Sequence, residues 1–161
     1  VLAAINGARE SLLLQQSYFV PNRDFRKALL EASARGVKVE VMVPNHLVDS
    51  KPTRYASQNY WAGLLRGGYR LYQYETTMMH AKLLVADARL SIVGSGNLDD
   101  RSFFINDEIN LNVISEEFAR EQTEMFRKDL RSSQEITLAN LGKILEPGYK
   151  RLFAWFIESQ L

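Results

Sequence analysis

Apolar runs and helical repeats alternate along the first part of the chain. Residues 12–20 have the pattern of a buried strand. After Asp24, the expected N-cap of a helix, apolar residues recur with a helical period until Gly36. Residues 37–43 carry valine at every second position, which predicts a second strand. Strand, helix and strand at this spacing predict a right-handed crossover between parallel strands, and hence an α/β fold.

The same pattern predicts the elements that follow. A polar stretch at 45–53 indicates a loop, and a helix at 55–65 and a third strand at 70–74 come after it. Two short apolar runs predict a pair of strands at 83–85 and 90–93, joined by a tight turn at 86–89. The last of these elements are a strand at 109–114 and a helix that Ser115 caps, with a break at Ser132 and Ser133.

The tail, residues 136–161, carries an apolar stripe. Its first part consists of Leu141, Ile144 and Leu145, and after Pro147 and Gly148 its second part consists of Tyr149, Leu152, Phe153 and Phe156. We expect the stripe to dock on its own domain. The alternative is that the second part, which also holds Lys150, Arg151 and Trp155, lies on a membrane surface.

Composition narrows the class of protein. The 161 residues, 46% of them apolar, suffice for one domain with a core, spanning 1–161. The net charge of +1 gives no global sign of a nucleic-acid partner, and the lack of cysteine excludes disulfides and thiolate zinc sites. With no long apolar span, we expect a cytoplasmic protein, at most peripheral to the cytoplasmic membrane. Because Val1 begins what reads as the middle of a helix, we expect the chain to be an excerpt.

Four polar side chains flank the predicted pair of strands. His80 and Lys82 stand two apart at the start of the first strand, and Ser95 and Asn97 stand two apart after the second. Each pair therefore points to one face, and we expect the four to converge on one pocket. Such a pocket suits a phosphodiester, because an imidazole can attack phosphorus or protonate a leaving oxygen. The ammonium and the two neutral donors would bind the non-bridging oxygens, and the scheme needs no metal or cofactor.

The joint spacing of these residues is more specific than any of them alone. A single histidine beside a strand is usually a packed or surface residue. Here the chain reads His80-Ala81-Lys82, four residues, Asp87, six residues, then 94–97 as Gly-Ser-Gly-Asn. This resembles the HxK(x4)D(x6)GSxN signature of the phospholipase D superfamily. The flanking stretches 18–21 and 94–103 look like the C-terminal half of a bacterial cardiolipin synthase, and the resemblance runs to Ile114.

The resemblance implies a fold and a mechanism. It implies a mixed, largely parallel sheet with helices on both faces, and double displacement through a phosphohistidine. It also implies that Glu108, after the motif, orients a histidine, either His80 or that of an opposite half; a carboxylate is well suited to hold an imidazole tautomer. Asp87 and Gly94 are expected to be structural, Asp87 in the turn and Gly94 where backbone approaches closely. Gly96 stands where the family more often has alanine.

One imidazole is only half of what double displacement needs. The other histidine, His46, is followed by leucine and valine, so it begins no second motif, and we interpret it as a loop residue near the site. The second imidazole must come from a missing half or from an identical chain.

Three functions follow from this requirement. The first is one half of a cardiolipin synthase or phospholipase D-like enzyme on a phosphatidylglycerol-like lipid, with His80 as general acid and base. The second is a homodimeric single-motif endonuclease that cleaves nucleic acid. The third, a non-catalytic remnant that binds phospholipid head groups, is disfavoured by the intact set of His80, Lys82, Ser95, Asn97 and Glu108.

Overall fold

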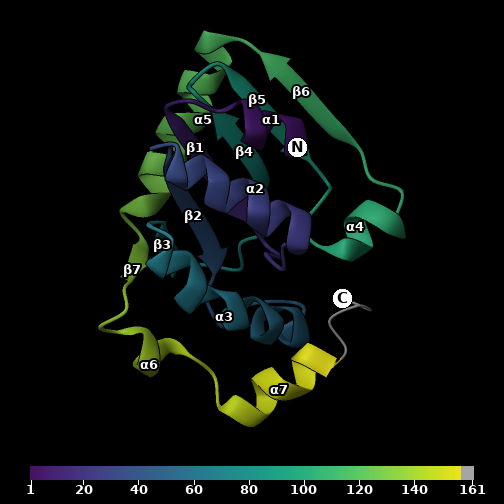
Figure 1. Cartoon of the computed structure of the whole chain (residues 1–161), viewed down its shortest axis with the longest axis vertical. Helices are drawn as coiled ribbons and strands as arrows, with labels where there is room; N and C mark the ends of the chain where they lie inside the picture. The colour runs from purple at the N-terminus through teal and green to yellow at the C-terminus, as the bar shows by residue number, and fades with distance from the viewer. Residues whose placement is uncertain (157–161) are drawn as a thin grey trace.

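The computed structural model describes residues 1–156 and has a seven-stranded mixed sheet with helices on both faces, which confirms the α/β fold class (Figure 1). The strand order is β6-β5-β4-β1-β2-β3-β7. Parallel pairing joins β1 to β2 and β2 to β3, and the remaining neighbours pair antiparallel, so the sheet is mixed as expected but not largely parallel. The strands are β1 (Ser11–Gln16), β2 (Lys38–Pro44), β3 (Arg70–Tyr74), β4 (Lys82–Ala86), β5 (Leu90–Gly94), β6 (Asn110–Ile114) and β7 (Ser133–Ile136).

Helices cover the two faces of the sheet unequally (Figure 1). One face carries α1 (Leu2–Gly7), α2 (Arg23–Ala34) and α3 (Lys51–Arg66), and the other carries α5 (Glu116–Leu130). Three short helices lie outside these layers: α4 (Asp100–Phe104), α6 (Leu141–Ile144) and α7 (Gly148–Phe156).

The central strand β1 shows why the apolar runs are nearly continuous. Leu12 and Leu14 belong to the core cluster beneath α2 and α3, whereas Leu13, between them, belongs to the cluster beneath α5. Successive side chains of a strand point to opposite faces, so a strand that is covered on both faces needs apolar residues at every position. The sheet is thus buried at its centre, beside the polar motif.

Several element boundaries differ from the prediction. The N-cap of α2 is Asn22, whose side-chain oxygen accepts the N–H groups of Asp24 and Phe25, so Asp24 lies inside the first turn. Helix α3 begins at Lys51, within the predicted loop, because Pro52 is tolerated in a first turn. The predicted break at Ser133 is the start of edge strand β7.

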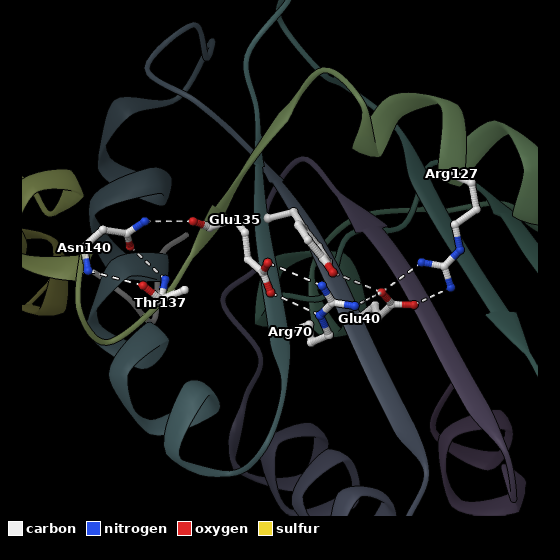
Figure 2. Close-up of polar contacts among 7 residues, drawn as sticks. Glu40, Arg70, Arg127, Glu135, Thr137 and Asn140 are labelled. Atoms are coloured by element: carbon white, nitrogen blue, oxygen red, sulfur yellow. Dashed lines mark hydrogen bonds and ion pairs between the residues drawn. The ribbon is translucent and has the colours of Figure 1, made fainter.

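A network of charged side chains fastens α5 and β7 to the sheet (Figure 2). Arg127 of α5 donates two hydrogen bonds to the carboxylate of Glu40, which is 6% exposed and also accepts the hydroxyl of Tyr72. Arg70 donates to Glu135 of β7 at 3.1 Å, and its Nη1 lies 3.7 Å from Glu40. Opposite charges at these positions therefore fix the helix and the edge strand against β2 and β3.

The apolar tail only partly follows the expectation that it docks on its own domain. Leu141 is buried, and Ile144 and Leu145 pack beside it against the core. In α7, however, the second part of the stripe is exposed and Ala154 is the buried residue, so that part of the expectation is wrong. Residues 157–161 of the tail lie outside the described residues. Within residues 1–156, no helix has the length and apolar character needed to cross a bilayer.

Candidate active site

Lys82 is the buried centre of the polar cluster that the motif predicts. Lys82 is the first residue of β4 and is 8% exposed. Its Nζ donates hydrogen bonds to Ser17 Oγ at 2.7 Å and to the carbonyl oxygen of His80 at 3.0 Å. The same Nζ lies 2.9 Å from Nδ1 and 3.1 Å from Nε2 of His80, whose side chain is 52% exposed. Burial lowers the pKa of Lys82, and the charges of nearby carboxylates oppose this shift. An accessible imidazole is thus held against a fixed amine.

Ser17, which the motif does not contain, links Lys82 to Asn97. The antiparallel pairing of β1 with β4 sets Gln16 opposite Lys82, so the next residue of the chain, Ser17, reaches the amine. Ser17 Oγ accepts from Lys82 Nζ and donates to Asn97 Oδ1 at 3.1 Å. Asn97 is 8% exposed and follows β5, so three adjacent strands contribute to one hydrogen-bond chain.

Glu108 extends this chain to Ser95. Its carboxylate accepts hydrogen bonds from Ser95 Oγ, from Ser102 Oγ at 2.9 Å and from Asn106 Nδ2 at 3.2 Å. Ser102 Oγ in turn accepts the N–H of Asn97 at 3.0 Å. The bond from Ser95 is the main cause that lowers the pKa of Glu108, so the carboxylate stays ionised at neutral pH. Ser95 therefore joins the cluster through Glu108 rather than through Lys82.

The carboxylate beside His80 belongs to Asp49, which sequence reasoning missed. Asp49 lies in the loop after β2, and its Oδ2 is 3.6 Å from His80 Nε2. Tyr18 hydrogen-bonds to Asp49, and its ring meets the imidazole edge-on with centroids 6.0 Å apart. Burial raises the pKa of Asp49, but the Tyr18 bond and the charge of His80 outweigh it, and the net shift is downward. Burial first, and then the bond to Asp49, raise the pKa of Tyr18.

Comparison with known proteins places this site in a family. The family model described as "Cardiolipin synthase, PLD-like domain" matches residues 1–130. The chain belongs to this family. The resemblance that the motif spacing indicates is thereby confirmed.

Relatives of this PLD-like chain are named as cardiolipin synthases. The protein named "Cardiolipin synthase" of Clostridium perfringens (strain SM101) is 37% identical over 139 residues, which cover 86% of this chain and 29% of that protein. "Cardiolipin synthase A" of Serratia proteamaculans is 41% identical over 118 residues, 73% of this chain and 24% of that protein. The chain thus spans less than a third of the length of these relatives.

Solved structures share the PLD-like fold. The phospholipase D family member Nuc of Salmonella typhimurium superposes with a TM-score of 0.73 at 22% identity, over 84% of this chain and 88% of that one. Phosphatidylserine synthase of Haemophilus influenzae gives a TM-score of 0.80 at 13% identity, over 99% of this chain and 44% of that one. At these identities, the likeness shows the fold alone.

Asp87, the acid of the PLD motif, lies at the far end of β4 from Lys82. Its carboxylate accepts hydrogen bonds of 2.8 to 3.0 Å from the backbone N–H groups of Arg9, Glu10 and Ser11, at the start of β1. These bonds outweigh the effect of burial and lower the pKa of Asp87. Asp87 thus joins the turn between β4 and β5 to the start of β1.

Gly94 permits the close approach of another strand of the PLD-like sheet. A Cβ at Gly94 would lie 2.8 Å from Asn110 Cα and closer still to the carbonyl oxygen of Ile109. The bond from Ser95 N–H to that carbonyl, 3.0 Å long, is made at the same place. The backbone that needs the space is therefore that of β6.

A cavity of about 270 Å³ opens beside the cluster, and of the four side chains expected to converge on one pocket only Asn97 is among its lining residues. Residues that line it include Tyr18, Ser50, Asn97, Asp99 and Arg101. Asp99 is 2% exposed and caps α4 through the N–H of Ser102, and burial raises its pKa. Tyr18 and Asn97 belong both to this cavity and to the cluster around His80, so a group bound in the cavity would adjoin the imidazole.

His46 lies apart from this cavity. It is exposed and lines a separate hollow of about 190 Å³ with Lys51, Arg54 and Lys150. Among residues 1–156, no group of three or more His, Asp or Glu side chains could hold a metal ion.

Proposed function

We propose that the chain is one half of a phosphatidyltransferase of the cardiolipin synthase type, acting on a phosphatidylglycerol-like lipid through a phosphohistidine. The observation that carries the proposal is the half-exposed imidazole of His80 held against the buried amine of Lys82, at the edge of a polar cavity. Relatives named as cardiolipin synthases support the lipid substrate.

The chemistry needs two imidazoles on opposite sides of phosphorus. In the first step a ring nitrogen attacks phosphorus, a nitrogen–phosphorus bond forms, and the bond to the leaving alcohol oxygen breaks as that oxygen takes a proton from the second imidazole. In the second step the acceptor hydroxyl gives its own proton to the second imidazole, its oxygen bonds to phosphorus, and the nitrogen–phosphorus bond to the first imidazole breaks. We assign His80 the general acid and base role, and Lys82 the stabilisation of the non-bridging oxygens. The attacking imidazole would come from the other half.

The contacts of Glu108 support the presence of a second half that supplies a histidine. Its bonds go to Ser95, Ser102 and Asn106, while the carboxylate beside His80 is that of Asp49. Of the two partners that the sequence leaves open for Glu108, these contacts favour the histidine of the opposite half.

Apolar side chains beside Glu108 support it further. Strand β6, which begins two residues after Glu108, is an edge strand. Exposed apolar side chains lie on it and in the segment before it: Phe104, Ile105, Ile109, Leu111 and Ile114. An exposed apolar group of this size next to an incomplete site is typical of a covered surface.

A second candidate is a homodimer that cleaves nucleic acid with one His80 from each copy. One observation favours it: the chain covers 88% of Nuc and, at a TM-score of 0.69, 87% of NucT of Helicobacter pylori, so a chain of this extent makes up most of each of those. The net charge of +1 does not favour a polyanion.

Light scattering and two substrates separate the candidates. We expect the purified chain to be a monomer with little turnover, and to transfer phosphatidyl groups from phosphatidylglycerol once the second half is supplied, with or without EDTA. His80→Asn should abolish turnover and keep the fold, and His46→Asn is the matched control that should keep both. A dimer that cleaves single-stranded DNA and leaves lipid intact would establish the second candidate. Turnover by a folded His80→Asn variant would overturn both.

A further inference from the structure

The amphipathic stripe of α7 points away from the protein. Tyr149, Leu152, Phe153 and Phe156 share one side of the helix by their spacing, and they are 72%, 55%, 60% and 70% exposed. Trp155, beside them, is 57% exposed. The buried residue, Ala154, is on the opposite side. A helix of a soluble domain normally turns its apolar stripe inward, so this stripe, which we call the α7 stripe, lacks a cover among residues 1–156.

Polar contacts with α3 fix this orientation. Gln58 Oε1 accepts the N–H of Glu146 at 2.8 Å just before α7, and Asn59 Nδ2 donates to the carbonyl of Arg151 at 3.2 Å within it. Arg54, 7% exposed at its side chain, bonds to the carboxylate of Glu146 at 2.9 Å. Figure 1 shows α7 along the outer side of α3, at the margin of the molecule. Rotating the stripe inward would break these bonds and place large rings where Ala154 fits.

The composition of the stripe and the charge around it select the partner. The four side chains of the stripe and Trp155 beside them, each more than half exposed, leave on the order of 500 Å² of apolar surface, near the upper limit for a monomer. Tryptophan and tyrosine are the residues that favour the membrane–water interface. From Leu141 to Phe156 the cations are Lys143, Lys150 and Arg151 and the anion is Glu146, a net charge of +2. Lys150 is paired with Glu146 at 3.1 Å, so the net charge is that of Lys143 and Arg151, and it is complementary to anionic lipid head groups.

We propose that the α7 stripe lies in the interface of an anionic phospholipid bilayer and docks the protein on it. A nine-residue helix is about 14 Å long, which is too short to cross a bilayer but sufficient to lie along its surface. The stripe enters the boundary between head groups and acyl chains, and the cations stay at head-group level. Docking needs no turnover, so the inference extends beyond the proposed function and can fail separately from it.

Trp155 reports on docking directly. The chain has two tryptophans, and the other, Trp61, is fully buried, so a change in emission on adding vesicles belongs to Trp155. With vesicles of phosphatidylglycerol and phosphatidylcholine we expect a blue shift of the Trp155 emission and co-sedimentation of the protein. Both effects should be weaker at higher salt, and weaker with vesicles of phosphatidylcholine alone. Unchanged Trp155 emission at saturating anionic vesicles would overturn the proposal.

A triple variant tests the stripe itself. Leu152→Ser, Phe153→Ser and Phe156→Ser together should lower partitioning onto vesicles at least tenfold, and should keep the fold because all three side chains are exposed. The matched control changes three exposed leucines elsewhere to serine: Leu30, Leu47 and Leu138. Equal binding by the α7 triple variant would overturn the proposal, as would a dimer in solution that this variant abolishes, since the stripe would then cover a second copy. If the unaltered chain binds vesicles but shows no turnover of soluble short-chain phosphatidylglycerol when its second half is supplied, the result would count against the proposed function alone.

Discussion

The carboxylate of Asp49 lies 3.6 Å from Nε2 of His80, and the two side chains come from different loops. Both side chains are about half exposed, and this carboxylate is close enough to the ring to hold the imidazole. A carboxylate in this position limits the rotation of the imidazole ring.

Asp49→Asn should lower kcat about tenfold and leave KM nearly unchanged, because Asp49 acts as a positioning residue through His80. A tenfold loss corresponds to about 1.4 kcal/mol. The pKa of Asp49 is below its ordinary value, so the wild-type rate should be supported by this carboxylate throughout the neutral range. The pH–rate profile of Asp49→Asn should differ from that of the wild-type protein in shape as well as in maximum rate. Asp107→Asn, another exposed carboxylate, is the control, and an equal loss there would contradict the assignment.

Asp87→Asn should weaken folding and spare the chemistry. The three backbone N–H bonds keep the pKa of Asp87 below its ordinary value, so its stabilising contribution is present above the unfolded pKa and is lost as pH falls through the folded pKa. We expect a loss of about 1–2 kcal/mol in urea unfolding at neutral pH and a smaller difference in acid. Reduced kcat in a fully folded Asp87→Asn protein would place this acid in the chemistry after all.

Arg127→Met should destabilise the protein by about 2 kcal/mol. It leaves the buried carboxylate of Glu40 with fewer partners, and the figure is below that of a fully buried pair because Arg127 is 45% exposed at its side chain. Although burial raises the pKa of Glu40, the bonds from Arg127 and the charges around it bring the net shift below the ordinary value, so this stabilisation also fades in acid. Arg120→Met, on the exposed side of the same helix, should change the free energy of unfolding little.

Gly94→Ala and Gly96→Ala should differ sharply. The added methyl group at Gly94 meets backbone of β6, which cannot move without breaking the pairing of β5 with β6. At Gly96 it meets only the side chain of Asn110, 2.9 Å from its Nδ2, which can rotate away. We expect Gly94→Ala to cost about 3 kcal/mol and Gly96→Ala less than 1 kcal/mol in thermal or urea unfolding. Equal effects would show that β6 is not held as described.

Local periodicity was sufficient for elements whose apolar residues repeat with the period of one buried face. The valines of β2 predict that strand because alternation is a local property. Strand β7 was missed because three of its four residues are polar and Ile136 alone is buried. The α7 stripe was misjudged because amphipathicity shows that a face needs a cover, and does not show which cover it has.

The site divides in the same way. His80 and Lys82 were expected together because they stand two apart at a strand end, and their side chains are in contact. Ser17 and Asp49 were missed because the antiparallel pairing of β1 with β4 and the loop after β2 bring them in, and neither relationship leaves a local signal. The roles assigned to His80, Lys82, Ser95, Asn97 and Glu108 stay predictions for the variants above.

The position of β1 at the middle of the sheet also bears on the order in which the molecule opens. Its backbone is paired on both sides, to β2 and β4, whereas β6 and β7 are edges. Amide protons of a central strand exchange with solvent last, and those of edges and end helices exchange first. Ser17 directly follows β1, and Lys82 lies on the neighbouring strand β4, which is also paired on both sides. Unfolding that starts at the edge strands would therefore break the outer contacts before it separated the amine of Lys82 from the hydroxyl of Ser17.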